Sequence, residues 1–185
     1  RSTGMSRRSQ ILLGLGLIGA GALAFWFWRG REASLDAVEA AVRQSYPEVP
    51  VVSTDALAAV LADSSRAPLL LDAREPREFA VSHLPGARQI APDAKPAALA
   101  EALSEVPRDR EIVVYCSVGY RSAGIAERLR EVGFTNVANL EGSIFRWANE
   151  GRPVVREGEP AHLVHPYNAT WGRLLAPERR APLTD

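Results

Sequence analysis

Short apolar segments alternate with amphipathic ones along the central part of the chain. The segments Val51–Ser53, Leu69–Leu71, Glu111–Tyr115 and Asn136–Asn139 predict short strands, and Arg88–Ile90 predicts a further one. Segments with helical spacing or helix-favouring composition fall between them, at 34–45, 54–61, 75–82, 96–103, 122–132 and 142–149. Because strands alternate with helices, we expect an α/β fold with a parallel sheet, whose chemistry lies at the carboxyl ends of the strands.

Residues 11–28 form an uncharged, apolar and glycine-rich run. A helix of this length just crosses a bilayer core of roughly 30 Å, so we expect a single transmembrane helix here. Phe25–Trp28 would form an aromatic belt at one interface. The alternative is a signal peptide cleaved at Ala22–Ala24, but cleavage would expose those aromatic residues, which favours an uncleaved anchor. Arginines on both sides leave the orientation open, with a slight lean towards an extracytoplasmic domain.

The remaining segments divide the chain around one soluble domain. Residues 1–10 form an N-terminal flank, and residues 29–49 form a linker or stalk helix that could also be the first element of the domain. The domain itself is expected at residues 50–153. Prolines break the pattern from Arg152 onward, so residues 154–185 are expected to form an extended arm that follows the domain surface or reaches a partner.

The charge balance and the single cysteine exclude several classes of protein. Lys and Arg number 22, as do Asp and Glu, so the net charge is zero and nothing favours nucleic-acid binding. A single cysteine excludes an internal disulfide framework and argues against a zinc site. His162 and His165 lie in the arm, with no cysteine beside them to complete a metal site. We therefore expect no metal and no cofactor.

The single cysteine, Cys116, lies where a nucleophile would be placed. It ends a predicted strand, and the loop Ser117–Arg121 then leads into a helix predicted from Ser122. Such a turn directs backbone N–H groups and the positive end of a helix dipole at one spot, which favours a thiolate. Gly119 permits a sharp turn, and Arg121 can offer several donors to an oxyanion. The alternative is that Cys116 is a small buried hydrophobic side chain.

Four motifs, in this order along the chain, resemble those of single-domain rhodaneses. They are Leu71–Phe79, His83–Ala87, the loop Cys116–Ser122 and Leu140–Trp147. The resemblance covers residues 50–153. Ser143 replaces the second glycine of the last motif, and Ser82 stands where the family often has glycine. We expect neither change to affect the chemistry.

The resemblance implies a five-stranded parallel sheet flanked by helices and preceded here by the transmembrane helix. It also implies a sulfurtransferase in which Cys116 takes sulfur from a donor such as thiosulfate, forms a persulfide, and passes the sulfur to cyanide or a thiol. Backbone N–H groups of the loop are expected to hold the persulfide charge, and Arg121 to bind the sulfonate. The alternative role of Arg121 is a salt bridge to a nearby carboxylate. The substrate-binding candidates are Ser117, Val118, Gly119, Tyr120, Arg121 and Ser122.

Individual candidates carry different expected roles. Val118 and Tyr120 are expected to form walls of the pocket, and Ser122 to act either as the helix N-cap or in catalysis. Asp72 and Arg74 are expected to be structural, with Asp72 binding loop amides and Arg74 pairing with Asp72 or with Glu78. His83 is expected to be a hydrogen-bonded scaffold residue rather than a general base.

The length of the loop bears on the choice of substrate. Related folds with a Cys-x5-Arg loop are phosphatases or arsenate reductases, whereas Cys116 and Arg121 here give Cys-x4-Arg. A smaller ring of amides suits a sulfur atom better than a phosphate or an arsenate. Sulfur transfer is therefore favoured over phosphatase activity.

A non-enzymatic binding or assembly subunit of a larger membrane complex is the alternative function. The predicted anchor at residues 11–28 and the aromatic residues Tyr167 and Trp171 in the arm motivate it. The same aromatic residues could instead pack on their own domain. The intact Cys-x4-Arg loop favours the enzyme, because a scaffold does not need it.

Overall fold

The computed structural model describes residues 34–63, 65 and 67–183, and the chain from Leu35 onward forms one compact unit. Within these described residues, no helix combines the length and the apolar character needed to cross a membrane. The predicted membrane helix at residues 11–28 and the flank at residues 1–10 lie outside the described residues.

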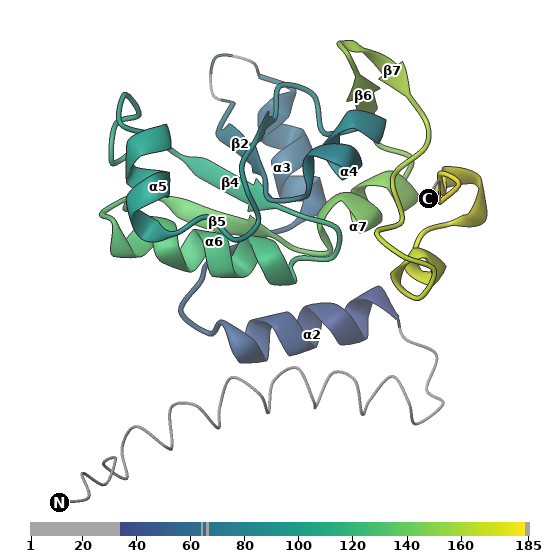
Figure 1. The fold of residues 1–185 in the computed structure, drawn as a ribbon, viewed down its shortest axis with the longest axis horizontal. Helices are drawn as coiled ribbons and strands as arrows, with labels where there is room; N and C mark the ends of the chain where they lie inside the picture. Colours follow the sequence, from purple (N-terminus) through teal and green to yellow (C-terminus); the bar gives the residue numbers. More distant parts are fainter. Residues whose placement is uncertain (1–33, 64, 66, 184–185) are drawn as a thin grey trace, which may run out of the picture. The chain divides into compact units, whose positions relative to one another are not determined.

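A five-stranded parallel sheet forms the centre of the domain, with strand order β1-β5-β4-β2-β3 (Figure 1). Its strands are β1 (Val51–Val52), β2 (Leu69–Asp72), β3 (Arg88–Gln89), β4 (Ile112–Tyr115) and β5 (Val137–Leu140). β4 lies between β2 and β5, and Asp72 at the end of β2 lies opposite Tyr115 at the end of β4. The predicted α/β fold is thus confirmed, and the carboxyl ends of β2 and β4 meet at one edge of the sheet.

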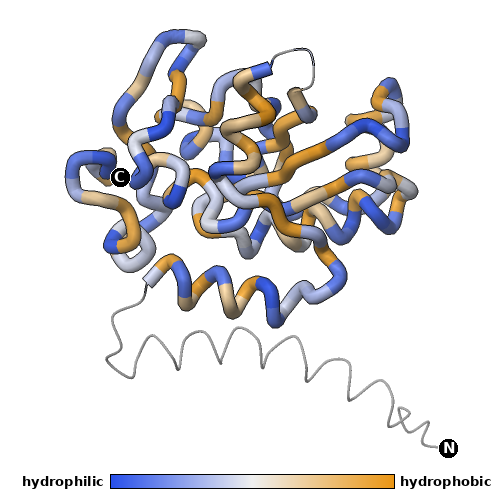
Figure 2. Tube along the Cα trace, turned by 180° about the vertical axis from the view of Figure 1, so that it is seen from behind, coloured by the Kyte–Doolittle hydropathy of each residue, from blue (hydrophilic) through white to orange (hydrophobic). Residues whose placement is uncertain are grey.

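Helices cover both faces of this sheet. They are α2 (Leu35–Ser45), α3 (Thr54–Leu61), α4 (Pro76–Val81), α5 (Pro96–Ala102), α6 (Tyr120–Glu131) and α7 (Ser143–Asn149). α6 packs on β4 and β5 with α5 beside it, and α3 contacts α7 (Figure 1). Along β4, Ile112 and Val114 join the buried cluster that contains α6 residues, so the alternation of a strand turns Val113 and Tyr115 to the opposite face. Figure 2 shows the strands as the hydrophobic centre of the domain.

Helix α2 packs on the domain through one apolar side. Val38 and Val42 are buried on that side, while Asp36, Arg43 and Gln44 of the same helix are exposed (Figure 2 shows the helix with alternating hydrophobic and hydrophilic positions). The Glu39 carboxylate is also buried and pairs with Arg146 of α7. Gly142 lies against this ion pair with a φ of 65°, where an added Cβ would collide with Arg146. Residues 35–49 of the segment expected as a linker, a stalk or the first element of the domain therefore belong to the compact unit.

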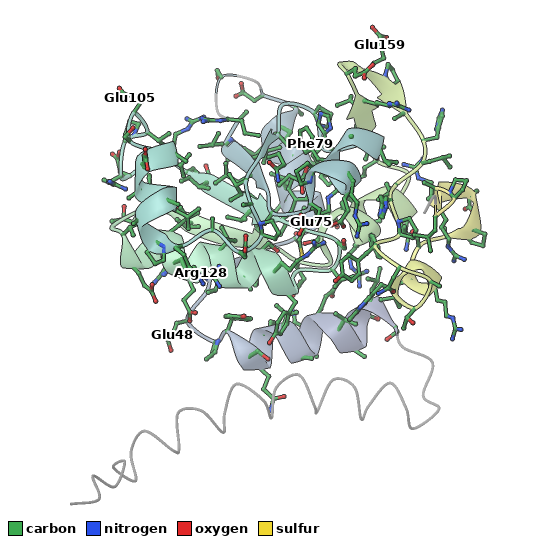
Figure 3. All side chains as sticks on the ribbon, viewed as in Figure 1. Glu48, Glu75, Phe79, Glu105, Arg128 and Glu159 are labelled. Carbon is green, nitrogen blue, oxygen red and sulfur yellow. The ribbon has the colours of Figure 1, made fainter. Side chains whose placement is uncertain are left out.

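The C-terminal segment folds back on its own domain. It forms an antiparallel hairpin of β6 (Val154–Arg156) and β7 (Glu159–Ala161), followed by the 3₁₀ helices η2 (Trp171–Leu174) and η3 (Pro177–Arg179). Figure 1 shows the segment after the hairpin beside α7, and Figure 3 labels Glu159 on the hairpin. Asn149 fixes it there, because its amide donates to the Leu174 carbonyl at 2.8 Å and accepts from the Ala176 N–H at 2.8 Å. Of the two expectations for the arm, the structure therefore agrees with the one in which the arm follows the surface of its own domain.

A buried ion pair closes the carboxyl end of β2. The Arg74 guanidinium donates to both oxygens of Asp72, at 2.9 Å from Nε to Oδ1 and 2.7 Å from Nη2 to Oδ2. Both side chains have no exposed surface. Nη2 also donates to the Ser82 carbonyl at 2.7 Å, which joins the strand end to the end of α4. Arg74 therefore pairs with Asp72 and not with Glu78.

We expect Asp72→Ala to lower the free energy of unfolding by about 3–5 kcal/mol, because it leaves a buried guanidinium without its counter-charge. The matched control is Asp55→Ala, which removes a carboxylate that is 90% exposed and paired with Arg152. This control is expected to cost less than about 1 kcal/mol. Urea denaturation followed by tryptophan fluorescence measures both. Equal losses in the two variants would contradict the structural role of Asp72.

Candidate active site

The strand–loop–helix turn after β4 places Cys116 at the carboxyl edge of the sheet. Cys116 directly follows the strand, and Gly119 forms the N-cap of α6 with a left-handed φ of 104°. Glycine adopts this conformation without strain, which allows the loop to close. The helix begins at Tyr120, earlier than the predicted start at Ser122. Ser122 therefore lies inside the first turn, and its expected role as N-cap is wrong.

The Cys116 thiol lies in a shielded and polar environment. Its side chain is 1% exposed, and its sulfur accepts a hydrogen bond from the Gly119 N–H at 3.2 Å. The backbone of the cysteine is tied to the start of α7, since its N–H donates to Ser143 Oγ at 3.2 Å and its carbonyl accepts from the Ile144 N–H at 3.2 Å. The sulfur position is thus fixed by both the loop and the neighbouring helix.

Opposing effects set the pKa of the Cys116 thiol. Burial raises the pKa, because it removes the thiolate from water. The positive charge of Arg121 lowers it, as do the contacts with Ser122 and the hydrogen bond from the N–H of Gly119. The stabilising contacts prevail, and the pKa lies below its ordinary value. A lowered pKa is typical of a nucleophilic cysteine, and it argues against a purely space-filling role.

A buried glutamate holds Arg121 in place. The two outer nitrogens of Arg121 donate to the two carboxylate oxygens of Glu78, at 2.8 and 2.9 Å, and Nη2 also donates to Ser117 Oγ at 3.0 Å. Burial alone would raise the pKa of Glu78, but Arg121 and the Glu75 N–H hold it below its ordinary value. Arg121 therefore has the salt bridge considered as its alternative role, and the carboxylate occupies the donors expected for a sulfonate.

A second polar contact supports the loop from β5. The Ser122 hydroxyl donates to Asn139 Oδ1 at 2.6 Å, and the Asn139 amide donates to the Gly119 carbonyl at 3.0 Å. Asn139 and Glu78 are site residues that the sequence reasoning missed. The signals for them are a buried polar residue within a predicted strand and a Glu-x-x-Glu capping pattern at the start of α4.

The remaining predicted residues lie around the loop in different positions. Val118 is buried and, together with Gly119 and Asn139, lines a small hollow bordered by α2. Tyr120 points to Tyr46, with the two rings edge to face at a centroid distance of 5.5 Å. His83 stacks on Phe79 of α4 at 3.8 Å, and its Nδ1 lies 3.1 Å from the Phe79 carbonyl (Phe79 is labelled in Figure 3). No contact links His83 to the sulfur among those of the described residues.

Known proteins are similar to the central part of the chain. Residues 53–150 match a family model described as a rhodanese-like domain. The chain belongs to the rhodanese-like family. A protein named "Sulfurtransferase" from Allochromatium vinosum is 36% identical over 104 residues, which are 56% of this chain and 92% of that protein.

Two further matches are to part of a longer protein and to a solved structure of about the size of the domain. A probable adenylyltransferase/sulfurtransferase, MoeZ, from Mycobacterium tuberculosis is 36% identical over 94 residues, which cover 49% of this chain and only 23% of that protein. The crystal structure of a rhodanese-like domain protein from Staphylococcus aureus has a TM-score of 0.50 and 26% identity, and covers 59% of this chain and 99% of that one. The matches therefore concern the domain, and the segment after residue 150 lies outside the family model.

Both departures from the rhodanese motifs make side-chain hydrogen bonds. Ser143 has a φ of 51°, a left-handed conformation that glycine adopts more easily. Its hydroxyl accepts from the Cys116 N–H and donates to the Leu140 carbonyl at 3.1 Å. Ser82 donates to the Leu163 carbonyl at 2.7 Å, which is a contact that glycine could not make. Ser143 therefore contacts the backbone of Cys116, and the expectation that neither change affects the chemistry stays a prediction.

We expect Arg121→Gln to raise the pKa of Cys116, because it removes the positive charge that favours the thiolate and leaves Glu78 without its counter-charge. Arg121→Lys keeps the charge and is expected to give a smaller rise. The pH dependence of Cys116 alkylation by iodoacetamide, followed by intact mass, measures the midpoint in each variant. An unchanged midpoint in Arg121→Gln would show that the guanidinium does not stabilise the thiolate.

Proposed function

We propose that this rhodanese-like protein is a sulfurtransferase that carries a sulfane sulfur as a persulfide on Cys116. The observation that carries the proposal is a buried thiol at the end of β4, whose sulfur accepts the Gly119 N–H at 3.2 Å in surroundings that lower its pKa. The thiolate, which a lowered pKa favours, is the nucleophile that sulfur transfer requires. The printed names of the relatives from Allochromatium vinosum and Mycobacterium tuberculosis also include sulfurtransferase.

The first half-reaction loads sulfur onto the enzyme. The Cys116 thiolate attacks the outer sulfur of thiosulfate, a new sulfur–sulfur bond forms, and the sulfur–sulfur bond of thiosulfate breaks. Sulfite leaves with the electron pair of that bond, and the terminal sulfur of the Cys116 persulfide keeps a negative charge. Backbone N–H groups at the start of α6 and the positive end of its dipole favour this charge without a metal.

The second half-reaction releases the sulfur. A thiophilic acceptor such as cyanide attacks the outer sulfur of the persulfide and leaves as thiocyanate, while the electron pair of the broken bond returns to Cys116 as thiolate. A thiol acceptor instead becomes a persulfide. The two steps form a ping-pong cycle in which the cysteine is regenerated and no external oxidant or reductant is consumed.

Arg121 acts in this scheme mainly through its charge. Its fork is occupied by Glu78, so a sulfonate that bound in the same way would have to displace a buried carboxylate. The guanidinium nevertheless contributes the largest single lowering of the Cys116 pKa. We therefore assign Arg121 the stabilisation of the thiolate and the persulfide, with donor binding as a secondary role.

The C-terminal arm favours the enzyme over the alternative of an assembly subunit. The arm was the proposed docking element, yet the Tyr167 ring lies over Arg121 of the same chain. Trp171 begins η2, which is packed on the domain through the buried Leu174. Aromatic residues engaged in this way support an intramolecular role for the arm.

Incubation with thiosulfate is expected to add the mass of one sulfur atom to the protein, as measured by intact mass spectrometry. Cyanide should remove the added mass, because a persulfide is thiophile-labile. Cys116→Ser is the matched control and is expected to gain nothing. The proposal fails if the wild-type chain gains no labile sulfur from thiosulfate or from an organic persulfide donor.

Membrane anchoring through residues 11–28 is an independent part of the proposal, supported by the uncharged apolar run in the sequence. We expect the full chain to stay in the membrane fraction after carbonate extraction, and a chain that lacks residues 11–28 to be released. Release of the full chain by carbonate would overturn the anchor and leave the chemistry at Cys116 untouched.

A further inference from the structure

A segment outside the rhodanese-like match covers part of the candidate active site. We call residues 163–168 the C-terminal strap. The strap begins where the Leu163 carbonyl accepts a hydrogen bond from Ser82, directly after α4. It then passes the ion pair of Glu78 and Arg121, and Tyr167 lies over the Arg121 guanidinium with its ring centroid 4.9 Å from Cζ. The family model ends at residue 150, so this contact is a feature of this chain beyond the matched domain.

Arg121 is held from two directions. The edge of its guanidinium donates to the Glu78 carboxylate, and its face is covered by the Tyr167 ring in a cation–π contact. These contacts leave its side chain 23% exposed. The same guanidinium interacts with Cys116 closely enough to lower the pKa of the thiol. The Arg121 side chain therefore contacts both Tyr167 and Cys116.

The strap is built to hold Tyr167 in this position. Tyr167 has a left-handed φ of 65°, which a non-glycine residue adopts only when its surroundings fix it. Its N–H donates to Nδ1 of the buried His165 at 3.0 Å. The strap is anchored before this point by Val164, whose N–H donates to the Arg179 carbonyl at 2.7 Å. After it, an added Cβ on Gly172 would lie 2.8 Å from Pro166, so the backbone packs closely there.

Covering Arg121 restricts the approach to the sulfur. Cys116 is 1% exposed, so any reagent must displace or pass the side chains around it. The Arg121 side chain interacts with Cys116, and Tyr167 covers the Arg121 guanidinium while remaining 38% exposed itself. A narrow anion can reach a thiolate beside a fixed guanidinium more easily than a bulky thiol or persulfide can.

We propose that Tyr167 is the specificity-determining residue of the Cys116 site, because its ring on Arg121 limits access to small sulfur donors and acceptors. This inference rests on the proposed sulfur transfer for its substrate class, which is small inorganic anions such as thiosulfate and cyanide. The steric effect of the Tyr167 ring applies to any reagent that modifies the Cys116 thiol. It can therefore be tested separately from the enzymatic activity.

The experiment compares a small and a bulky reagent on the full chain. Wild type, Tyr167→Ala and Tyr167→Phe are treated with iodoacetamide or with the bulky aromatic disulfide 5,5′-dithiobis(2-nitrobenzoate), and the rates of Cys116 modification are measured. We expect Tyr167→Ala to increase the rate with the bulky reagent, relative to the small one, by ~10-fold, a typical effect of reshaping a pocket wall. Tyr167→Phe keeps the ring and is expected to behave like wild type.

Two controls keep the interpretation specific. Leu163→Ala removes an exposed side chain of the same strap, and Arg43→Ala opens the α2 side of the loop, where Arg43 pairs with Glu141. Neither is expected to change the ratio of the two rates. The pH midpoint of iodoacetamide alkylation in Tyr167→Ala should stay close to that of wild type, because the Glu78–Arg121 pair remains. A shifted midpoint, with rates that rise equally for both reagents, would mean that Tyr167 acts on the thiolate and not on access.

Sulfur loading provides the second readout. Tyr167→Ala is expected to load faster than wild type from glutathione persulfide and to load from thiosulfate at a similar rate. If Tyr167→Ala leaves the ratio of the two alkylation rates unchanged, or if Arg43→Ala changes it instead, the specificity role is overturned. If no variant accepts sulfur from any donor but the alkylation ratio responds to Tyr167→Ala, the sulfur-transfer proposal fails while the steric role of Tyr167 stands.

Discussion

A buried carboxylate fixes the arginine on which the charge of the nucleophile depends. Glu78 has no exposed side-chain surface and binds Arg121 through two hydrogen bonds. The rigid guanidinium then stabilises the Cys116 thiolate, together with N–H groups at the start of α6. Without these contacts, burial would raise the pKa of the thiol and leave it protonated. The pKa of the Cys116 thiol thus depends on an ion pair between α4 and the first turn of α6.

The rest of the fold positions the two halves of this ion pair. Parallel pairing of β2 with β4 brings the carboxyl ends of both strands to one edge of the sheet, so α4 and α6 begin close together. Asp72 and Arg74 fix the chain where β2 leads into α4. Asn139 and Ser143 support the loop from β5 and α7. The C-terminal strap then covers Arg121 from outside the family domain.

The sequence allowed the strands and the position of Cys116, in a loop between a strand and a helix, to be predicted, because each is a local pattern. The start of α6 was placed too late, since Ser122 is a good N-cap by residue type while the helix is actually capped by the backbone conformation of Gly119. Contacts over long sequence separations were not predictable from local patterns. Arg121 and Glu78 are 43 residues apart, and Cys116 and Ser143 are 27 apart. Such pairs meet only once the order of the strands in the sheet is known.

The central claim is that the surroundings of Cys116 lower the pKa of its thiol, and so favour the thiolate, although the side chain is buried. The most direct measurement is the ultraviolet absorbance of the thiolate as a function of pH, with Cys116→Ser subtracted to remove the tyrosine signal. Our account predicts a single titration with a midpoint below that of an ordinary cysteine, which is about 8.5. A midpoint at or above this value would contradict the account, because it would mean that burial outweighs the charge of Arg121 and the N–H groups of the loop.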